Sequence, residues 1–364
     1  MLGLVDAFCS MVRLSSESGH EDAFIAFLRR LLTEESGAVC STDAYGNLVA
    51  RLPARNSQVR EASLFGFHAD TVKPGEGIEP VVKDGVIRSQ GETILGADDK
   101  AGIAEFLEAL RTVSCHPPLE IVITRDEELG LKGSKNLDMS LLSAKVGFVI
   151  DMDSLDAIVI GGPSKMSIDV TLTGKAAHAG MEPEKGISAI RAASHAVVML
   201  REGRIDEETT VNVGTIRGGE IRNGVPDKAR LELECRSLSH DRCLGQCELV
   251  KQVFETAARA AGVKSDIVMD LSYKASRLAA DSRPVRVAEQ AMRSVGLTPK
   301  IRVIGGGTDA SVYNARGIET VVLGAGMHDE HTQDEHIAVK DMETAVRTIT
   351  EILVLLADSR MRRN

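Results

Sequence analysis

Residues 62–70, with the sequence ASLFGFHAD, join a short apolar run to a histidine and an aspartate. The apolar part, Ala62–Phe67, has the length and composition of a buried strand. His68 and Asp70 stand two positions apart, so their side chains project from the same side of the chain if the strand conformation persists. A carboxylate beside a metal-binding imidazole fixes its tautomer and raises its basicity. The stretch therefore predicts a strand that ends at a candidate metal ligand, although an isolated His-x-Asp pattern is more often a surface loop.

Similar apolar runs recur along the chain, with helical patterns between them. The further predicted strands are Leu119–Thr124, Lys145–Ile150 and Thr320–Leu323. Apolar residues at helical spacing predict helices over Glu21–Leu32, Ala101–Val113, Ala279–Gly296 and Thr344–Leu356. This alternation favours an α/β sandwich in which helices cover a sheet.

A different pattern begins near Ser164, where polar and apolar residues alternate as in a half-exposed strand. Strand and helix patterns then follow in the order β-α-β-β-α-β, with helices over Lys185–Leu200 and Asp241–Ala261. We therefore expect a compact inserted domain at residues 164–276. It interrupts a larger domain made of residues 1–163 and 277–364.

The composition limits the classes of function. The 364 residues include 43 Lys plus Arg against 53 Asp plus Glu, a net charge of −10, which disfavours nucleic acid and anionic membrane surfaces as partners. No apolar run approaches the roughly 18 residues of a membrane span. The six cysteines contain no CxxC pair and show no metal-ligand constellation, and the first residues do not resemble a signal peptide. We expect a cytoplasmic protein in a reducing setting.

Acidic residues and histidines gather in four further segments. These are GADDKAG (96–102), TRDEELG (124–130), DMD (151–153) and MHDEHTQDEH (327–336). Each has an ordinary explanation alone, since paired acids cap helices and acidic runs occur in solvated turns. However, four of the five clusters, the His68 cluster included, directly follow predicted strands, where open α/β sheets bind ligands. Their convergence predicts a single site.

Histidine and carboxylate ligands suit zinc and related divalent ions. The candidate carboxylates outnumber those that one structural zinc needs. This surplus favours two catalytic metal ions, roughly 3.5–4 Å apart and bridged by a carboxylate and a water, with a spare glutamate as the base.

Taken together, HAD, GADDKAG, RDEELG, the acid after VI, and HTQDE resemble the co-catalytic zinc peptidase family that contains peptidase T, carboxypeptidase G and succinyl-diaminopimelate desuccinylase. The likeness covers essentially the whole chain and is greatest to the peptidase T-like branch. It implies an α/β/α catalytic domain with a mixed sheet, interrupted by a smaller lid and dimerisation domain.

The resemblance also implies a role for each candidate residue. For one metal ion the ligands are His68 and Asp151, and Asp70 orients His68. The other ion has Glu128 and His331. Asp98 bridges the two, with Asp99 as the alternative bridge and Asp153 as the alternative to Asp151. Glu127 is the catalytic base. The implied substrate-binding residues of the inserted domain are His178, Asn212 and Asn223.

The expected function is therefore hydrolysis of short peptides by a cytoplasmic homodimer that binds two divalent ions, Zn²⁺ or else Co²⁺ or Mn²⁺. The peptidase T-like features favour a tripeptide aminopeptidase. Carboxypeptidase-type relatives hold a substrate carboxylate with an arginine near the end of the insertion, where this chain has Lys274 and Arg277. A carboxypeptidase or an N-acyl amino acid amidohydrolase therefore stays open. A metal- or peptide-binding protein without catalysis is the alternative from another class.

Overall fold

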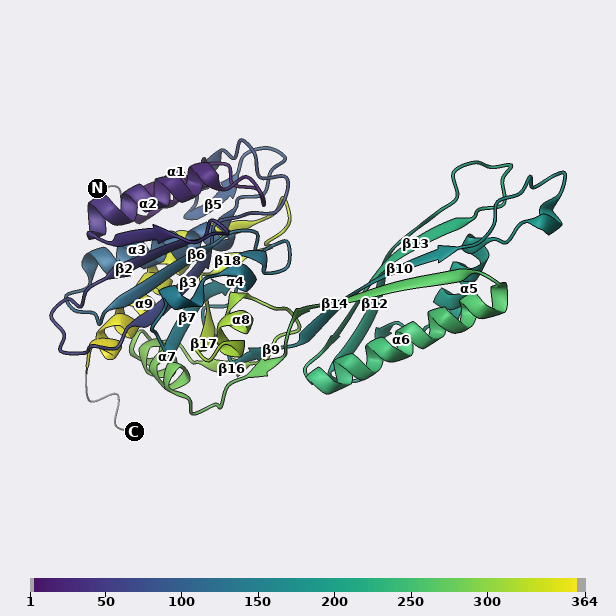
Figure 1. The fold of residues 1–364 in the computed structure, drawn as a ribbon. Helices are drawn as coiled ribbons and strands as arrows, with labels where there is room; N and C mark the ends of the chain where they lie inside the picture. The colour runs from purple at the N-terminus through teal and green to yellow at the C-terminus, as the bar shows by residue number, and fades with distance from the viewer. Residues whose placement is uncertain (1–2, 359–364) are drawn as a thin grey trace. The chain divides into compact units, whose positions relative to one another are not determined.

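The computed structural model describes residues 3–358, which divide into two compact units. Unit 1 comprises the described residues up to Gly161, Arg277–Ile304, and those from Thr308 onward. Unit 2 comprises Gly162–Ser276 and Gly305–Gly307. Figure 1 shows the strands and helices of both units.

Unit 1 contains an eight-stranded sheet in the order β1-β2-β6-β3-β7-β17-β8-β16. The central neighbours β6, β3, β7 and β17 are parallel, whereas β1 with β2, β2 with β6, and β17 with β8 pair antiparallel. The sheet is therefore mixed, as predicted. Its strands are β1 (Val39–Thr42), β2 (Leu48–Leu52), β3 (Ser63–His68), β6 (Leu119–Thr124), β7 (Val146–Met152), β8 (Ala157–Val159), β16 (Lys300–Arg302) and β17 (Glu319–Gly324).

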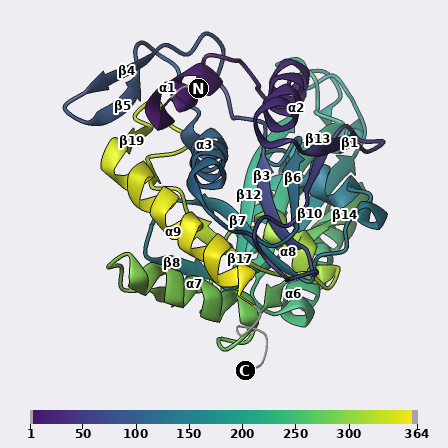
Figure 2. The same cartoon turned by 90° about the vertical axis from the view of Figure 1, so that its left-hand side faces the viewer.

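Side chains of the central strands alternate between two apolar cores. In β3, for example, Phe65 and Phe67 belong to one core and Leu64 to the other. The first core is shared with helices that appear together in Figure 2: α1 (Leu4–Val12), α2 (Asp22–Ser36), α3 (Ala97–Thr112), α7 (Arg283–Ser294) and α9 (Val339–Ala357). The second core includes residues next to or within α4 (Lys132–Asn136) and α8 (Asp309–Ala315). Helices thus cover both faces, which confirms the α/β/α class.

A smaller antiparallel sheet of unit 1 has the order β18-β19-β5-β4. Its strands are β4 (Pro80–Lys83), β5 (Val86–Ser89), β18 (Met327–His328) and β19 (His336–Ala338). The loop between β18 and β19 carries most of the histidine-rich segment 327–336. A short 3₁₀ helix, η1 (Met139–Leu141), precedes β7, while the short strands β9 (Gly161–Gly162) and β15 (Ser276–Arg277) lie where the chain passes between units.

Unit 2 is an antiparallel sheet, β11-β12-β13-β10-β14, with two helices. Its elements are β10 (Ser164–Thr173), η2 (Pro183–Lys185), α5 (Ala189–Met199), β11 (Gly203–Arg204), β12 (Thr209–Gly218), β13 (Lys228–Ser237), α6 (His240–Ala261) and β14 (Lys264–Tyr273). Both helices share one apolar core with the sheet. The order β-α-β-β-α-β is confirmed, with β11 added as a short edge strand.

Four predicted helix starts are wrong: α3 begins at Ala97 and not at Ala101, α9 begins at Val339 and not at Thr344, and two other helices begin later than predicted. The helix expected from Lys185 begins at Ala189, because Ser188 caps it by accepting a hydrogen bond from the Arg191 N–H. The helix expected from Ala279 begins at Arg283, after Ser282 and with Pro284 in its first turn. None of the helices within residues 3–358 is long and apolar enough to cross a membrane.

Candidate metal centre

Parallel strands place most of the candidate ligands at one edge of the large sheet. His68 ends β3, Glu127 and Glu128 follow β6, and Asp151 is the penultimate residue of β7. Because β3 pairs parallel with both β6 and β7, the carboxyl ends of these strands meet at the same edge. Asp98 comes to this edge from the first turn of α3.

Asp98 lies between the two histidines. Its Oδ1 lies 3.0 Å from His68 Nε2, and its Oδ2 lies 3.1 Å from His331 Nε2. His68 Nε2 is also 3.6 Å from an Asp151 oxygen, and His331 Nε2 is 2.9 Å from Glu128 Oε1. The five predicted ligands therefore form two groups, each with one histidine and one further carboxylate, that share Asp98.

The ring of His68 is held so that Nε2 points to the carboxylates. His68 is 2% exposed, and its Nδ1 lies 2.9 Å from the backbone carbonyl oxygen of Asp70. A carbonyl oxygen can only accept, so Nδ1 carries the hydrogen and leaves the Nε2 lone pair available to a metal ion. The carboxylate of Asp70 is farther from Nδ1, at 3.4 Å.

The Asp70 carboxylate mainly holds the turn that carries Glu127 and Glu128. Its Oδ1 accepts the Glu127 N–H at 2.9 Å, and its Oδ2 accepts the Glu128 N–H at 3.1 Å. The Ser18 hydroxyl donates to Oδ2 at 2.7 Å. Asp70 thus links the His68 strand end to the backbone of both glutamates.

The same turn is fixed from its other side by Glu21, which is fully buried. Glu21 Oε1 accepts the Asp126 N–H at 3.1 Å, and its Oε2 forms an ion pair with Arg125 at 2.7 Å. Asp126 has φ of 50°, in the left-handed region that costs a non-glycine residue free energy. His331 has φ of 64°, so both loops that face the site hold strained backbone.

The charges at the site are strongly coupled. Burial alone raises the pKa of Asp98, but hydrogen bonds with His331 and His68 outweigh it and hold that pKa below its ordinary value. Hydrogen bonds to Asp98 and Glu128 raise the pKa of His331 to about 10. Burial and the charge of Asp98 raise the pKa of Asp151 to about 8. The acidic cluster thus favours positive charge at its centre, which protons or metal ions can supply.

Burial also raises the pKa of Glu127 well above its ordinary value, and the charges of Asp151 and Asp309 act in the same direction. A general base is most effective when its pKa lies near the working pH. The Glu127 environment is therefore suited to a carboxylate that takes up and returns a proton, in contrast to a solvated turn.

The donor set fits divalent metal ions. Two imidazole nitrogens and carboxylate oxygens are the ligands of zinc and similar ions, and a carboxylate facing two groups is the arrangement of a two-metal site. His68, Asp98 and Glu128 each offer a ligand atom within 4.8 Å of the others, as do His68, Asp99 and Asp151. Because it belongs to the second grouping, Asp99 stays the alternative to Asp98 as the bridging carboxylate. Its Oδ1 is buried without a hydrogen-bond partner and could therefore accept a metal ion. Asp153 belongs to neither grouping, and its Oδ1 accepts the Ser154 N–H at 2.7 Å.

Sequence reasoning missed Glu335, which is 1% exposed and lies four residues after His331. Its carboxylate accepts three backbone N–H groups, those of Gly96 and Ala97 at 2.7 Å and that of Asp98 at 3.1 Å. Glu335 therefore fixes the backbone that presents the shared carboxylate. The motif HTQDE contains this glutamate, but nothing local to the motif indicates a partner more than 230 residues earlier.

A Glu335→Ala variant is expected to bind metal about 10–100-fold more weakly, as for other losses of outer-shell partners. The alanine leaves three buried N–H groups without an acceptor, each costing about 1–3 kcal/mol of stability. Competition with a metal chelator and thermal unfolding measure the two effects. Glu335→Gln retains an acceptor oxygen and should lose less, and Asp334→Ala, at an exposed neighbour, should change neither. Unchanged metal affinity in Glu335→Ala would contradict this role.

The three predicted substrate-binding residues belong to unit 2 and are exposed. The N–H of Ala179 donates to the Asn223 carbonyl, and His178 forms a bridge with Gly224, so His178 and Asn223 lie on neighbouring segments. Asn212 lies on β12, opposite Glu234. Their roles toward substrate stay predictions.

Comparisons with known proteins agree with this geometry. The family model described as Peptidase dimerisation domain matches residues 161–261, and the model for Peptidase family M28 matches residues 47–196. The uncharacterized protein YqjE of Bacillus subtilis is 34% identical, over 96% of this chain and 97% of its own.

Two solved structures are similar over nearly the full length. Aminopeptidase PepT from Bacillus cereus is 37% identical, with a TM-score of 0.88 over 98% of both chains. A tripeptidase from Staphylococcus aureus is 34% identical, with a TM-score of 0.91 over 97% of this chain and 98% of that one. The chain therefore belongs to the peptidase T-like branch of the M20 family and is a metal-dependent peptidase.

Proposed function

We propose that this protein is a tripeptide aminopeptidase that uses two divalent metal ions, with Zn²⁺ as the native metal. The observation that carries the proposal is the position of Asp98, whose two oxygens face His68 and His331 separately. His68 and Asp151 would hold one ion and His331 and Glu128 the other, with Asp98 shared. Co²⁺ and Mn²⁺ accept similar ligands and are the alternatives.

When bound, the metal ions polarise the scissile carbonyl and make a water more acidic. Glu127 accepts a proton from the attacking water and returns it to the amine that leaves as the C–N bond breaks. Asp70 holds the backbone of Glu127 and Glu128 in place during this exchange. In unit 2, His178, Asn212 and Asn223 are proposed to bind substrate.

The choice of a tripeptide with a free amine rests on the two similar structures, one named an aminopeptidase and the other a tripeptidase. Hydrolysis of a free-amine tripeptide, monitored by release of its first amino acid, tests this choice. We expect cleavage of the free tripeptide and a large loss of rate when its amine is acetylated. Faster cleavage of the acetylated peptide, or release of the last amino acid, would instead identify an N-acyl amino acid amidohydrolase or a carboxypeptidase.

We further propose that residues 164–276 act as lid and dimerisation domain, so that the protein is a homodimer. Support comes from the match of residues 161–261 to the Peptidase dimerisation domain model. Sizing at micromolar concentration should show a species of twice the chain mass, and a monomer alone would refute the dimer.

All six cysteines are free thiols, which supports the proposed reducing, cytoplasmic setting.

A further inference from the structure

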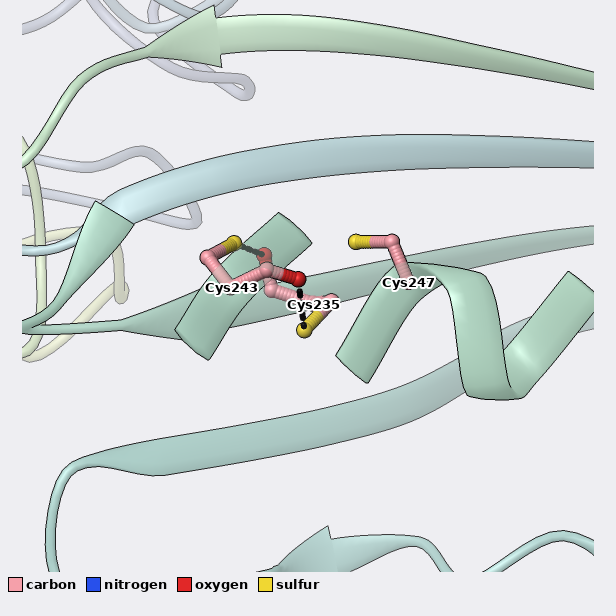
Figure 3. Close-up of side chains that lie close together, drawn as sticks. All are labelled: Cys235, Cys243 and Cys247. Atoms are coloured by element: carbon pink, nitrogen blue, oxygen red, sulfur yellow. Dashed lines mark hydrogen bonds between the residues drawn. The ribbon is translucent and has the colours of Figure 1, made fainter. Parts of the chain in front are cut away.

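The sequence shows no metal-ligand constellation among the cysteines, but the structure brings three of them together. Cys235, Cys243 and Cys247 place their sulfur atoms within 4.8 Å of one another. All three are at most 1% exposed and lie in the apolar core of unit 2. Figure 3 shows that strand β13 supplies Cys235 and that α6 supplies the other two.

Helix and strand geometry explain how the cluster forms. Cys243 and Cys247 are four residues apart on α6, so they lie one above the other on the same helix face. Cys235 points to the same core as Leu231 and Leu233, two and four residues earlier on β13. The packing of α6 on β13 therefore brings the three thiols together.

The hydrogen bonds from these thiols to backbone carbonyls are long. Cys235 Sγ donates to the Cys243 carbonyl at 3.8 Å, and Cys243 Sγ lies 3.6 Å from the Cys235 carbonyl and 3.8 Å from that of Ser164. None of the three forms a disulfide. A buried thiol can also serve as a small apolar group, so simple core packing is the explanation that a test must exclude.

The ligands determine the choice of ion: sulfur selects soft ions, and structural zinc takes four ligands whereas the grouping found in the described residues has three. Two further features favour a metal ion over packing alone. Met166 of β10 is buried and directly opposite Cys235, so its thioether, another soft ligand, lies on the same sheet face. Cys243 stands in the first turn of α6, where the helix dipole favours a thiolate.

We propose that Cys235, Cys243 and Cys247 form a sulfur-only site for one soft monovalent metal ion, and Cu⁺ is the ion of this class that we expect it to bind. The site lies within unit 2 and does not involve the ligands of the peptidase centre. Each thiol that binds the ion releases its proton to solvent, and the oxidation states of the metal and of sulfur do not change. Because water does not reach the sulfurs, we expect slow loading that requires local opening between α6 and the sheet.

The test uses the full chain, reduced, zinc-loaded and kept free of oxygen. Cu⁺ is supplied as its glutathione complex until uptake stops, and competition with a chromophoric Cu⁺ chelator gives the affinity. We expect one Cu⁺ per chain, and an affinity about 100-fold or more lower in Cys243→Ala and Cys247→Ala, since even outer-shell losses cost on the order of 10–100-fold. Cys9→Ala, at a buried cysteine of unit 1, is the matched control and should bind as the parent does.

X-ray absorption on the loaded parent protein keeps the test independent of how well the variants fold. The proposal expects a copper environment of sulfur atoms alone. Nitrogen or oxygen ligands, equal binding by the cysteine variants and Cys9→Ala, or tighter binding of Zn²⁺ than of Cu⁺ at these cysteines would each overturn it. Tripeptide hydrolysis by the same samples reports separately on the peptidase centre, so a failed copper site leaves the proposed function standing.

Discussion

Glu127→Gln is expected to lower kcat by about 10²–10⁴-fold, the usual contribution of a general acid–base group. Glutamine has nearly the same shape, and the Glu127 backbone N–H that Asp70 accepts is unchanged by the substitution. The fold and the metal content should therefore survive while the proton acceptor is lost. Steady-state hydrolysis of the tripeptide, together with elemental analysis of the same sample, measures both.

Asp126→Asn is the matched control for that experiment. Asp126 is the preceding acid in the same turn, but its Oδ2 accepts a hydrogen bond from the Tyr45 hydroxyl at 2.8 Å. Asparagine still offers an oxygen to Tyr45, so we expect activity within a few-fold of the parent. If Glu127→Gln hydrolysed the peptide at a near-normal rate, Glu127 would not be the base.

Asp98→Asn is expected to remove the capacity to hold two metal ions and, with it, nearly all activity. Each Asp98 oxygen faces a different histidine, so one substitution damages both ligand groups. Loss of a residue that only hydrogen-bonds a metal ligand lowers metal affinity by about 10–100-fold, so the loss of a ligand itself should lower it by at least that much. Chelator competition followed by elemental analysis gives the number of ions retained.

Asp99→Asn separates the two candidate bridges. Burial and the charge of Asp151 raise the pKa of Asp99 well above its ordinary value, so its side chain favours the neutral form, which asparagine imitates. We expect Asp99→Asn to retain both ions and most of the activity. Loss of metal in Asp99→Asn with retention in Asp98→Asn would reverse the assignment.

The sequence predicted the central strands well because they are continuous apolar runs that lie buried between two layers of helices. Leu119–Thr124 forms a strand with the predicted bounds. The short strands β1, β2 and β4 were not predicted: the residues of β1 and β4 are mostly exposed or half-buried, whereas β2 is a mostly buried strand of five residues. The place of β1 and β4 depends on pairing with β2 and β5.

The site could be predicted only in part. Strand ends explain why His68, Glu127 and Asp151 converge, but the two-sided position of Asp98 came from the family resemblance and not from spacing. The contacts of Glu335 and Glu21 join segments far apart in the chain, and no local pattern reports them. The cysteine cluster had one visible signal, the four-residue spacing of Cys243 and Cys247, while Cys235 joins them only through packing.

This chain is expected to cleave peptides with two metal ions held by the ligands around Asp98. The decisive measurement is elemental analysis of purified protein, paired with tripeptide hydrolysis before and after chelation. We expect about two zinc-like ions per chain in the N/O site, loss of cleavage on chelation and its return when Zn²⁺ is restored. Full activity in protein stripped of metal, or failure of the reconstituted protein to bind any ion, would exclude the two-metal mechanism.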